Sequence, residues 1–376
     1  MAIIPYKHIS ILIMPTDYCN MNCVYCFNGK RTCREKIVMT EKVLEHIFHI
    51  TLPFYSEVKI IWHGGEPLSV GKNFYEKVVE LEKKENVNDA VVYNSIQTNL
   101  TLLDEEYAEF FLKNGFHIGS SYDGITNEKT RHNSERILSG HEILKKCGGN
   151  NGFICVVQKN NIDHLIEDYE WFKKKKINYN LNHYLADPTK PNELLVPVEH
   201  YVQRMCEFFD YWLMDTGCNI SVSYFENYLK YILKGYKNLC CFNSCMGKHI
   251  GIHYDGTIYG CNREFPEKYS FGNVLDYEDI HECFESRGFH ELLQSAVKRR
   301  NLCKEKCEIF NFCAGGCNSV ALVSGNLEAE NRYVCNIRRQ IYKYIEEKVI
   351  LVKLIQENEL KKQINPYMLK YLAREN

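Results

Sequence analysis

The chain of 376 residues is long enough for one large domain and a smaller one, and its 45% of hydrophobic residues can form a sizeable core. A formal net charge of −2 leaves no basic surplus, so we expect neither nucleic acid nor an acidic membrane surface as a partner. Because no signal peptide and no apolar run of membrane-spanning length is visible, we expect a cytoplasmic protein.

Cysteine is used unusually often, with 18 residues in the chain. Cytosolic thiols stay reduced, so clustered cysteines there indicate metal binding or catalysis rather than disulfides. Twelve of them form two groups, within residues 19–26 and 240–335. The others, including Cys283 between the motifs of the second group, are expected to pack as small apolar residues: Cys33, Cys147, Cys155, Cys206, Cys218 and Cys283.

Short β-like segments alternate with helical patterns up to about residue 183. The predicted strands are Ile9–Met14, Val58–Trp62, Ala90–Ile96, His117–Tyr122, Gly152–Val157 and Tyr179–His183. The predicted helices between them are Thr40–Thr51, Asn73–Lys84, Glu105–Lys113, Glu135–Lys146 and Asp163–Lys175. This alternation predicts an α/β fold with a parallel sheet. Six such strands would form an open, partial (β/α)6 barrel, with its active site at the carboxyl ends of the strands.

Cys19, Cys23 and Cys26 follow the first predicted strand with the spacing C-x3-C-x2-C, so they fall at that end of the barrel. Three thiolates can bind three irons of a [4Fe–4S] cluster and leave the fourth open for a ligand. A zinc knuckle or a disulfide-rich segment is the alternative. Zinc motifs usually pair two C-x2-4-C units, whereas here three cysteines are followed by an aromatic residue.

This spacing resembles the radical S-adenosylmethionine (SAM) superfamily. The resemblance implies that the open iron binds SAM and that the reduced cluster cleaves it to a 5′-deoxyadenosyl radical. Tyr25 lies within the motif, and Gly64, Gly65 and Glu66 of a GGEP segment follow the second strand. By resemblance, these four residues are assigned to binding SAM.

The third and fourth predicted strands end in polar residues. Ser121 and Asp123 suit the ribose hydroxyls of SAM, and Gln97 and Asn99 suit a peptide backbone or the SAM carboxylate. The competing interpretation is that these are ordinary polar loop residues, satisfied by their neighbours.

The second cysteine group surrounds a predicted hairpin, Gly251–Tyr254 with Thr257–Tyr259, and a predicted helix, Tyr277–Arg300. It resembles the SPASM extension of radical SAM proteins, which implies two auxiliary [4Fe–4S] clusters and three clusters in all. The first would be held by Cys245, Cys261, Cys317 and either Cys240 or Cys241; the second by Cys303, Cys307, Cys313 and Cys335. Cys303 departs from the pattern, with three residues rather than two before Cys307. A structural zinc domain is the alternative.

The predicted domains are a radical SAM partial barrel (1–235), a SPASM domain (236–340) and a helical segment (341–376).

Together, the GGEP, QTN and cysteine motifs resemble the anaerobic sulfatase maturases and related peptide maturases. In the sulfatase maturases an aspartate follows the cysteine of G-x4-C and is assigned as the base; here that residue is Asn262. An amide cannot accept that proton. We therefore predict a maturase of a ribosomally made peptide that forms carbon–carbon or thioether cross-links. Formylglycine formation from Ser or Cys, and peptide epimerisation, are the alternatives.

The expected partners are a precursor peptide or protein and a one-electron reductant such as flavodoxin or ferredoxin. Only 18 residues precede Cys19. We therefore expect no leader-binding domain there; a separate protein or the barrel surface would bind the leader. A scaffold that keeps its clusters only for structure, or an enzyme acting on a small molecule, stays open.

Overall fold

The computed structural model describes residues 7–27, 35–186, 192–237, 239–262, 266–354, 359 and 362–373. Cys33 lies outside these residues. Packing divides the chain into two units, each discontinuous in sequence. Unit 1 comprises Met1–Ser121, Arg131–Asn151 and Cys245–Ala296, and unit 2 comprises Tyr122–Thr130, Gly152–Ser244 and Val297–Asn376.

Unit 1 is built on strands in the order β4-β3-β2-β1-β7-β8. β1 to β4 pair in parallel, β7 is parallel to β1, and only β8 is antiparallel to its neighbour. The strands are β1 His8–Ile13, β2 Glu57–Trp62, β3 Val91–Thr98, β4 His117–Ser121, β7 His249–Ile252 and β8 Ile258–Tyr259. The predicted hairpin is therefore confirmed, and it joins the parallel sheet at β1.

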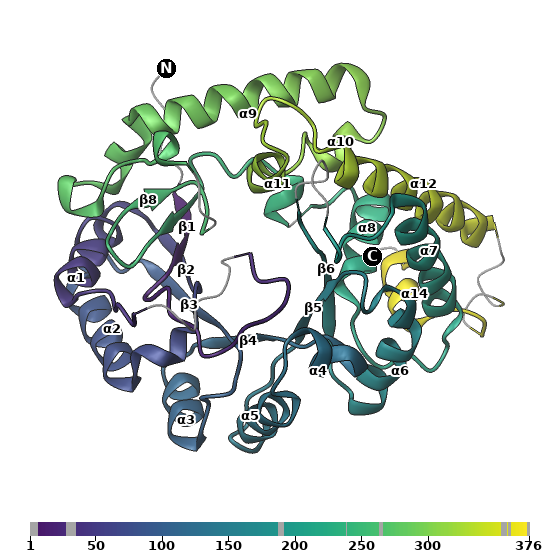
Figure 1. Cartoon of the computed structure of the whole chain (residues 1–376), viewed down its shortest axis with the longest axis horizontal. Coiled ribbons are helices and arrows are strands. Elements are labelled where there is room, and N and C mark those ends of the chain that lie inside the picture. Colours follow the sequence, from purple (N-terminus) through teal and green to yellow (C-terminus); the bar gives the residue numbers. More distant parts are fainter. Residues whose placement is uncertain are drawn as a thin grey trace. The chain divides into compact units, whose positions relative to one another are not determined.

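Helices α1 (Glu41–His49), α2 (Lys72–Glu85), α3 (Glu105–Lys113) and α5 (Ser134–Lys146) complete the βα alternation of unit 1 (Figure 1). Each begins and ends within two residues of its predicted limits. Side-chain caps explain two of the starts: Thr40 accepts a hydrogen bond from the Val43 N–H, and Asp104 accepts one from the Tyr107 N–H. The apolar side of each helix is buried, as its periodicity predicts.

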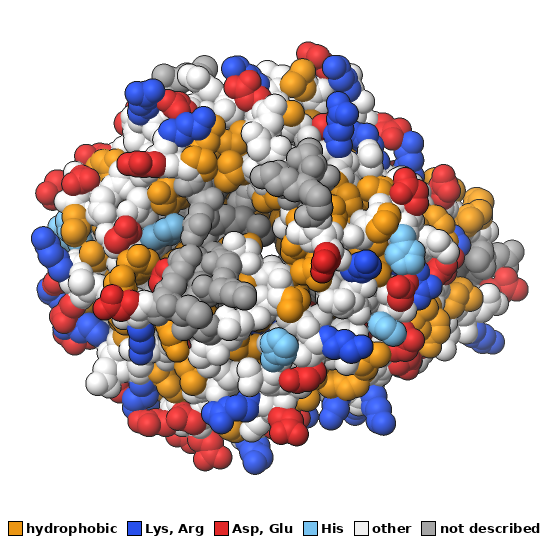
Figure 2. All heavy atoms as spheres, viewed as in Figure 1, with side chains coloured by type: hydrophobic (Ala, Val, Ile, Leu, Met, Phe, Trp, Pro, Cys, Tyr) orange, Lys and Arg blue, Asp and Glu red, His pale blue; other side chains and the backbone are white. Residues whose placement is uncertain are grey.

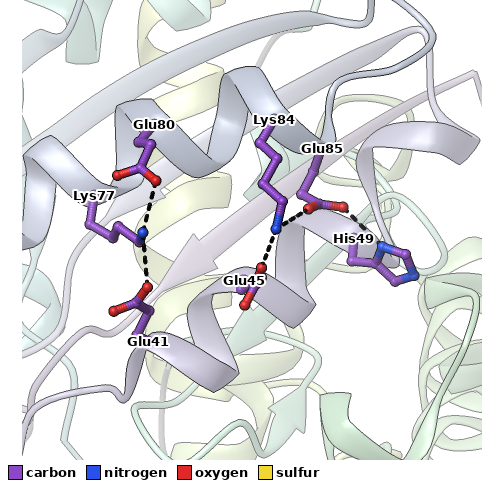
Figure 3. A network of polar contacts seen from close by, with 7 residues as sticks. All are labelled: Glu41, Glu45, His49, Lys77, Glu80, Lys84 and Glu85. Atoms are coloured by element: carbon purple, nitrogen blue, oxygen red, sulfur yellow. Dashed lines mark hydrogen bonds and ion pairs between the residues drawn. The ribbon is translucent and has the colours of Figure 1, made fainter.

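Ion pairs connect α1 to α2 on the surface of unit 1 (Figure 3). Lys77 Nζ lies 2.9 Å from Glu41 and 2.9 Å from Glu80, and Lys84 Nζ lies 2.5 Å from Glu45. Because water screens these exposed charges, each pair contributes little to the free energy of folding. The network therefore orients two helices without deciding their stability.

Unit 2 contains the parallel strands β5 (Phe153–Val157) and β6 (Tyr179–His183). Its helices include α4 (Asn127–Thr130), α6 (Leu165–Lys175), α7 (Val198–Met214), α8 (Ser223–Lys234), α10 (Phe310–Cys313), α11 (Asn318–Val323), α12 (Arg332–Leu354) and α14 (Pro366–Leu372). α12 packs against α7 and α8. The aromatic stretches of α7 and α8 form core, because Phe208, Phe209, Trp212 and Phe225 are almost fully buried.

The predicted helix Tyr277–Arg300 is wrong at its start and too short at its end. The 3-10 helix η7 (Val274–Asp276) ends just before it, a second 3-10 helix, η8 (Ile280–Glu285), occupies its first part, and α9 runs from Arg287 to Lys306. Asp279 and Glu282 form a capping box that begins η8, and Ser286 is extended, which separates it from α9. Likewise, the helix that enters the predicted C-terminal helical segment (341–376) begins earlier, at Arg332, as α12, and so includes Cys335.

Acidic and basic side chains are interspersed over the face shown in Figure 2, as the near-neutral net charge suggests. Within the described ranges, no helix combines the length and hydropathy needed to cross a membrane.

Candidate active site

The loop that carries the first three cysteines is held by the GGEP backbone. The Gly65 N–H donates to the Thr16 carbonyl at 3.1 Å, and the Glu66 N–H donates to the Tyr18 carbonyl at 2.7 Å. A Cβ on Gly65 would lie 2.0 Å from the Tyr18 oxygen, closer than any side chain permits. The glycine was predicted to allow close approach of a ligand. The structure shows that it allows close approach of the cysteine loop itself.

Glu66 joins the ends of β2 and β3. Its side chain is buried, and its carboxylate accepts hydrogen bonds from the Leu68 N–H (2.9 Å), the Thr98 hydroxyl (2.6 Å) and the Asn99 N–H (2.7 Å). Burial raises its pKa despite these donors, and Arg131 opposes the shift. The carboxylate therefore braces the loop after β2, which adds a structural role to the SAM-binding role predicted for this residue.

The Asn99 side chain contacts the cysteine loop. Its amide nitrogen lies 2.8 Å from Asn20 Oδ1 and 3.9 Å from Cys19 Sγ, and its oxygen accepts from the Thr101 N–H and hydroxyl. Hydrogen bonds to a ligating group orient it and tune the metal. Asn99 is thus a positioning residue for Cys19. Its predicted role in substrate binding stays a prediction, as does that of Gln97, whose amide donates to Ser121 Oγ at 3.2 Å.

The thiols of Cys19, Cys23 and Cys26 are half-buried. Burial, and secondarily the charge of Glu66, raises the pKa of Cys19 to about 12, so this thiol would ionise only when iron binds. No three His, Cys, Asp or Glu side chains of the described residues are close enough to share a single metal ion. A cluster binds each thiolate to a different iron, which fits three separated thiols on one loop better than one zinc ion does.

Arg131 is a site residue that sequence reasoning missed. It is 8% exposed, and its Nη1 donates to the Tyr25 hydroxyl at 3.1 Å. Together with its electrostatic effect on Glu66, this places a buried cation beside the cysteine loop, where it could pair with a carboxylate. Its position in the loop between α4 and α5 gave no local signal.

Asp123, in unit 2, is fully buried. Its two carboxylate oxygens accept hydrogen bonds from the Val156 N–H (3.0 Å) and the Thr130 hydroxyl (2.7 Å). The residue therefore links the turn after β4 to β5. Its assignment to the SAM ribose stays a prediction, since the chain itself already supplies a donor to each oxygen.

Asp168 of α6 supports the same turn, and it should make the stability of the protein depend on pH. It accepts from the Ile125 N–H at 2.8 Å, and burial raises its pKa from 3.8 to about 8. Between pH 4 and 8 the unfolded chain loses this proton and the folded chain keeps it, so stability falls as pH rises. Asp168→Asn removes that loss. Its unfolding free energy, measured in urea, should match that of the parent at pH 4 and exceed it at pH 8 by several kcal/mol, since each unit of pKa shift corresponds to about 1.4 kcal/mol. An unchanged difference across this range would contradict the assignment.

Cys245 and Cys261 belong to unit 1. A Cβ on Gly251 of β7 would lie 2.4 Å from the Cys261 carbonyl carbon, so the chain after β8 passes directly over β7. The Asn262 side chain is 7% exposed, and its oxygen accepts from the Cys261 thiol at 3.5 Å. The residue at the position of the maturase base is therefore held beside a cysteine predicted to be a ligand.

The remaining SPASM cysteines lie in unit 2. Cys240 is exposed, whereas Cys241 is half-buried and interacts electrostatically with Cys317; burial raises its pKa to about 11. These differences favour Cys241 over Cys240 as the predicted fourth ligand. Cys303 and Cys307 lie one helical turn apart, since α9 runs to Lys306 and the Cys307 N–H donates to the Cys303 carbonyl. The extra residue between them therefore still leaves both thiols on one face.

Comparisons with known proteins identify both parts of the chain. The radical SAM superfamily model matches residues 13–172, and the model of the SPASM iron–sulfur cluster-binding domain matches residues 240–308. The predicted domain limits at residues 235 and 340 stay a prediction.

A cysteine-type anaerobic sulfatase-maturating enzyme of Clostridium perfringens is 30% identical over 368 residues, which is 92% of this chain and 98% of the relative. A serine-type enzyme of Bacteroides thetaiotaomicron is 26% identical, over 83% of each chain. The solved structure of native anSMEcpe with bound AdoMet superposes with a TM-score of 0.82 and 28% identity, over 92% of this chain and 99% of that one. Streptococcus suis SuiB bound to S-adenosylmethionine, at 17% identity, a TM-score of 0.62 and coverage of 87% and 77%, shares the fold.

These findings confirm the predicted fold class, an open partial barrel joined to a cysteine-rich auxiliary domain, and its cofactors, SAM and [4Fe–4S] clusters. The chain belongs to the radical SAM/SPASM maturase family that includes the anaerobic sulfatase-maturating enzymes.

Proposed function

We propose that this enzyme oxidises a cysteine or serine side chain of a polypeptide to an aldehyde, as in formylglycine formation. The similarity to the C. perfringens cysteine-type enzyme over nearly the full length of both chains carries this proposal. The solved anSMEcpe structure with the Cp18Cys peptide, at 29% identity and a TM-score of 0.81, supports a peptide or protein substrate. The order of the two sequence-based candidates is thereby reversed.

SAM on the reduced N-terminal cluster would supply the radical that removes a hydrogen atom from the substrate. Cys19, Cys23 and Cys26 would hold that cluster, and Asn99 would orient Cys19 through its amide. Tyr25 with Arg131, the glycines and Glu66 of the GGEP segment, and Ser121 would line the SAM site, with Arg131 as the cation for the SAM carboxylate.

The auxiliary clusters would complete the oxidation. Removing one hydrogen atom leaves a carbon radical, and forming the carbonyl or thiocarbonyl requires loss of one more electron and one proton. With a cysteine substrate, water then adds to the thiocarbonyl and hydrogen sulfide leaves, which gives the aldehyde. Complete cysteine ligation suits an electron acceptor better than a substrate-binding site, since no iron stays open. The proposed ligands are Cys241, Cys245, Cys261 and Cys317 for the first cluster, and Cys303, Cys307, Cys313 and Cys335 for the second.

Asn262 favours a second candidate, oxidative cross-linking of a ribosomally made peptide. The proton lost in aldehyde formation needs an acceptor, and the amide at this position accepts hydrogen bonds but not a proton. A cross-linking reaction also releases one proton, but from the attacking group of the substrate, so the group that accepts it need not lie at the position of Asn262.

Mass spectrometry separates the two candidates. The reconstituted full chain is incubated anaerobically with SAM, reductant and sulfatase-type peptides containing cysteine or serine, and in parallel with short peptides encoded beside the gene. Formylglycine in the sulfatase-type peptide supports the proposal. Loss of two hydrogens from a peptide encoded beside the gene, with fragment ions that stay covalently linked, would instead establish cross-linking.

Asn262→Asp tests the missing base directly. The substitution is nearly isosteric, and it provides a carboxylate at the position where the sulfatase maturases have one. We expect formation of formylglycine from the cysteine peptide to rise by at least about tenfold, within the usual contribution of a positioned base. The comparison is the rate of 5′-deoxyadenosine formation, which should change little. No gain in aldehyde would contradict the role assigned to this position.

A further inference from the structure

Arg338 of α12 is a buried cation beside the SPASM cysteines of unit 2. Its side chain is 6% exposed, and its Nη1 donates to Cys313 Sγ at 3.4 Å. The guanidinium carbon lies 5.1 Å from the centroid of the Phe242 ring. A Cβ on Gly316 would lie 3.7 Å from Nη1, which is ordinary van der Waals contact, so the guanidinium packs next to this glycine.

No carboxylate among the described residues forms an ion pair with Arg338. Its electrostatic partners are the thiols of Cys313 and Cys241 and the hydroxyl of Tyr228. Its neighbours on the same helix are different. Arg339 also interacts electrostatically with a cysteine, Cys307, but its charge is paired with Glu330 at 2.8 Å, and Lys343 is exposed and paired with Glu308.

A buried arginine stays charged, and a buried charge without an opposite charge is strongly destabilising. Of these partners, the Cys313 and Cys241 thiols are the groups that binding of iron would ionise, and a thiolate supplies the negative charge. Among the described residues, Arg338 therefore has no negative charge beside it, and it would acquire one when the cluster binds.

Two further arginines shape the loop that Arg338 contacts. Arg299 donates to the Gly315 carbonyl at 2.9 Å, and Arg300 donates to the Ala314 carbonyl at 2.6 Å. Ala314 adopts a left-handed conformation with φ 54°, which the two neighbouring contacts help to hold. These residues fix the loop between Cys313 and Cys317, whereas Arg338 reaches a sulfur.

We propose that Arg338 is a positioning residue of the second auxiliary cluster, which it makes easier to reduce by donating a hydrogen bond to Cys313 and placing an uncompensated positive charge beside it. This inference rests on the cluster assignment given above. A cluster with four thiolates gains one negative charge on reduction, and a cation in a low-dielectric surrounding stabilises the more negative state more strongly. The cluster would then be a better acceptor for the electron that leaves the substrate radical.

The test measures reduction potentials rather than turnover. The full chain carrying Cys19→Ala, Cys23→Ala and Cys26→Ala retains only the auxiliary clusters. Arg338→Met, Arg338→Gln and Arg338→Lys are each introduced into this background and titrated with dithionite, followed by electron paramagnetic resonance. Lys343→Met is the matched control, because it removes an exposed and paired cation from the same helix.

We expect one of the two auxiliary midpoints to move to a more negative potential in Arg338→Met and Arg338→Gln, to move less in Arg338→Lys, and to stay in place in Lys343→Met. Loss of auxiliary iron from the two neutral variants, with retention in the lysine variant, would also support a requirement for the charge. Parental midpoints in both neutral variants would overturn the proposal. So would loss of iron from all three, since shape rather than charge would then be what matters. Absence of any [4Fe–4S] signal in the background chain would instead refute the cluster assignment on which the proposal rests.

Discussion

Replacing Cys19, Cys23 and Cys26 together by alanine is expected to abolish reductive cleavage of SAM while leaving the auxiliary iron in place. The three thiols lie on one loop after β1, and no other cysteine is predicted to bind that cluster. Without it, SAM has no electron source within the site. Chromatography of 5′-deoxyadenosine should show a rate at the level of the enzyme-free control.

Iron content provides the control for this experiment. Since each cluster holds four irons, the triple variant should lose about one third of the iron of the parent and keep the rest. Replacement of Cys155, a buried cysteine of β5 predicted to pack as an apolar residue, should leave both SAM cleavage and iron content unchanged. Persistent SAM cleavage in the triple variant would show that the central assignment is wrong.

Gly65→Ala is expected to disrupt the same cluster without removing a ligand. The added Cβ would lie 2.0 Å from the Tyr18 carbonyl oxygen, and that atom belongs to the backbone directly before Cys19. Backbone cannot rotate away as a flexible side chain can, so the loop must shift. A displacement of about 1 Å at a reacting centre costs about a hundredfold in rate. We therefore expect SAM cleavage to fall by about that factor, with partial loss of iron.

A matched glycine shows that the effect is local. Gly217 is exposed, and a Cβ there would meet only Asp215 Oδ1 at 3.5 Å and Lys173 Nζ at 3.8 Å, which is ordinary van der Waals contact. Gly217→Ala should cleave SAM like the parent. If Gly65→Ala did so too, the close approach of the two loops would not be what positions the cluster.

Up to residue 183, the amino-acid sequence by itself determined the order of the strands and of the longer helices, each to within two residues; the short helix α4 was not predicted. Hydrophobic periodicity and caps such as Thr40 and Asp104 act over a few residues, so a local pattern carries them. The sequence also allowed the three cysteines of the N-terminal motif to be recognised, because they lie close together along the chain. The helix predicted from Tyr277 failed because the Asp279 cap and the extended Ser286 divide a stretch of helical composition.

The tertiary structure decided how those motifs support one another. Asn99 reaches Cys19 across 80 positions, and Arg131 reaches Tyr25 across 106. The preference proposed for Cys241 over Cys240 rests on burial, as does the proposal for Arg338. Contacts between distant residues and the exclusion of water arise only when the chain packs, so no local pattern encodes them.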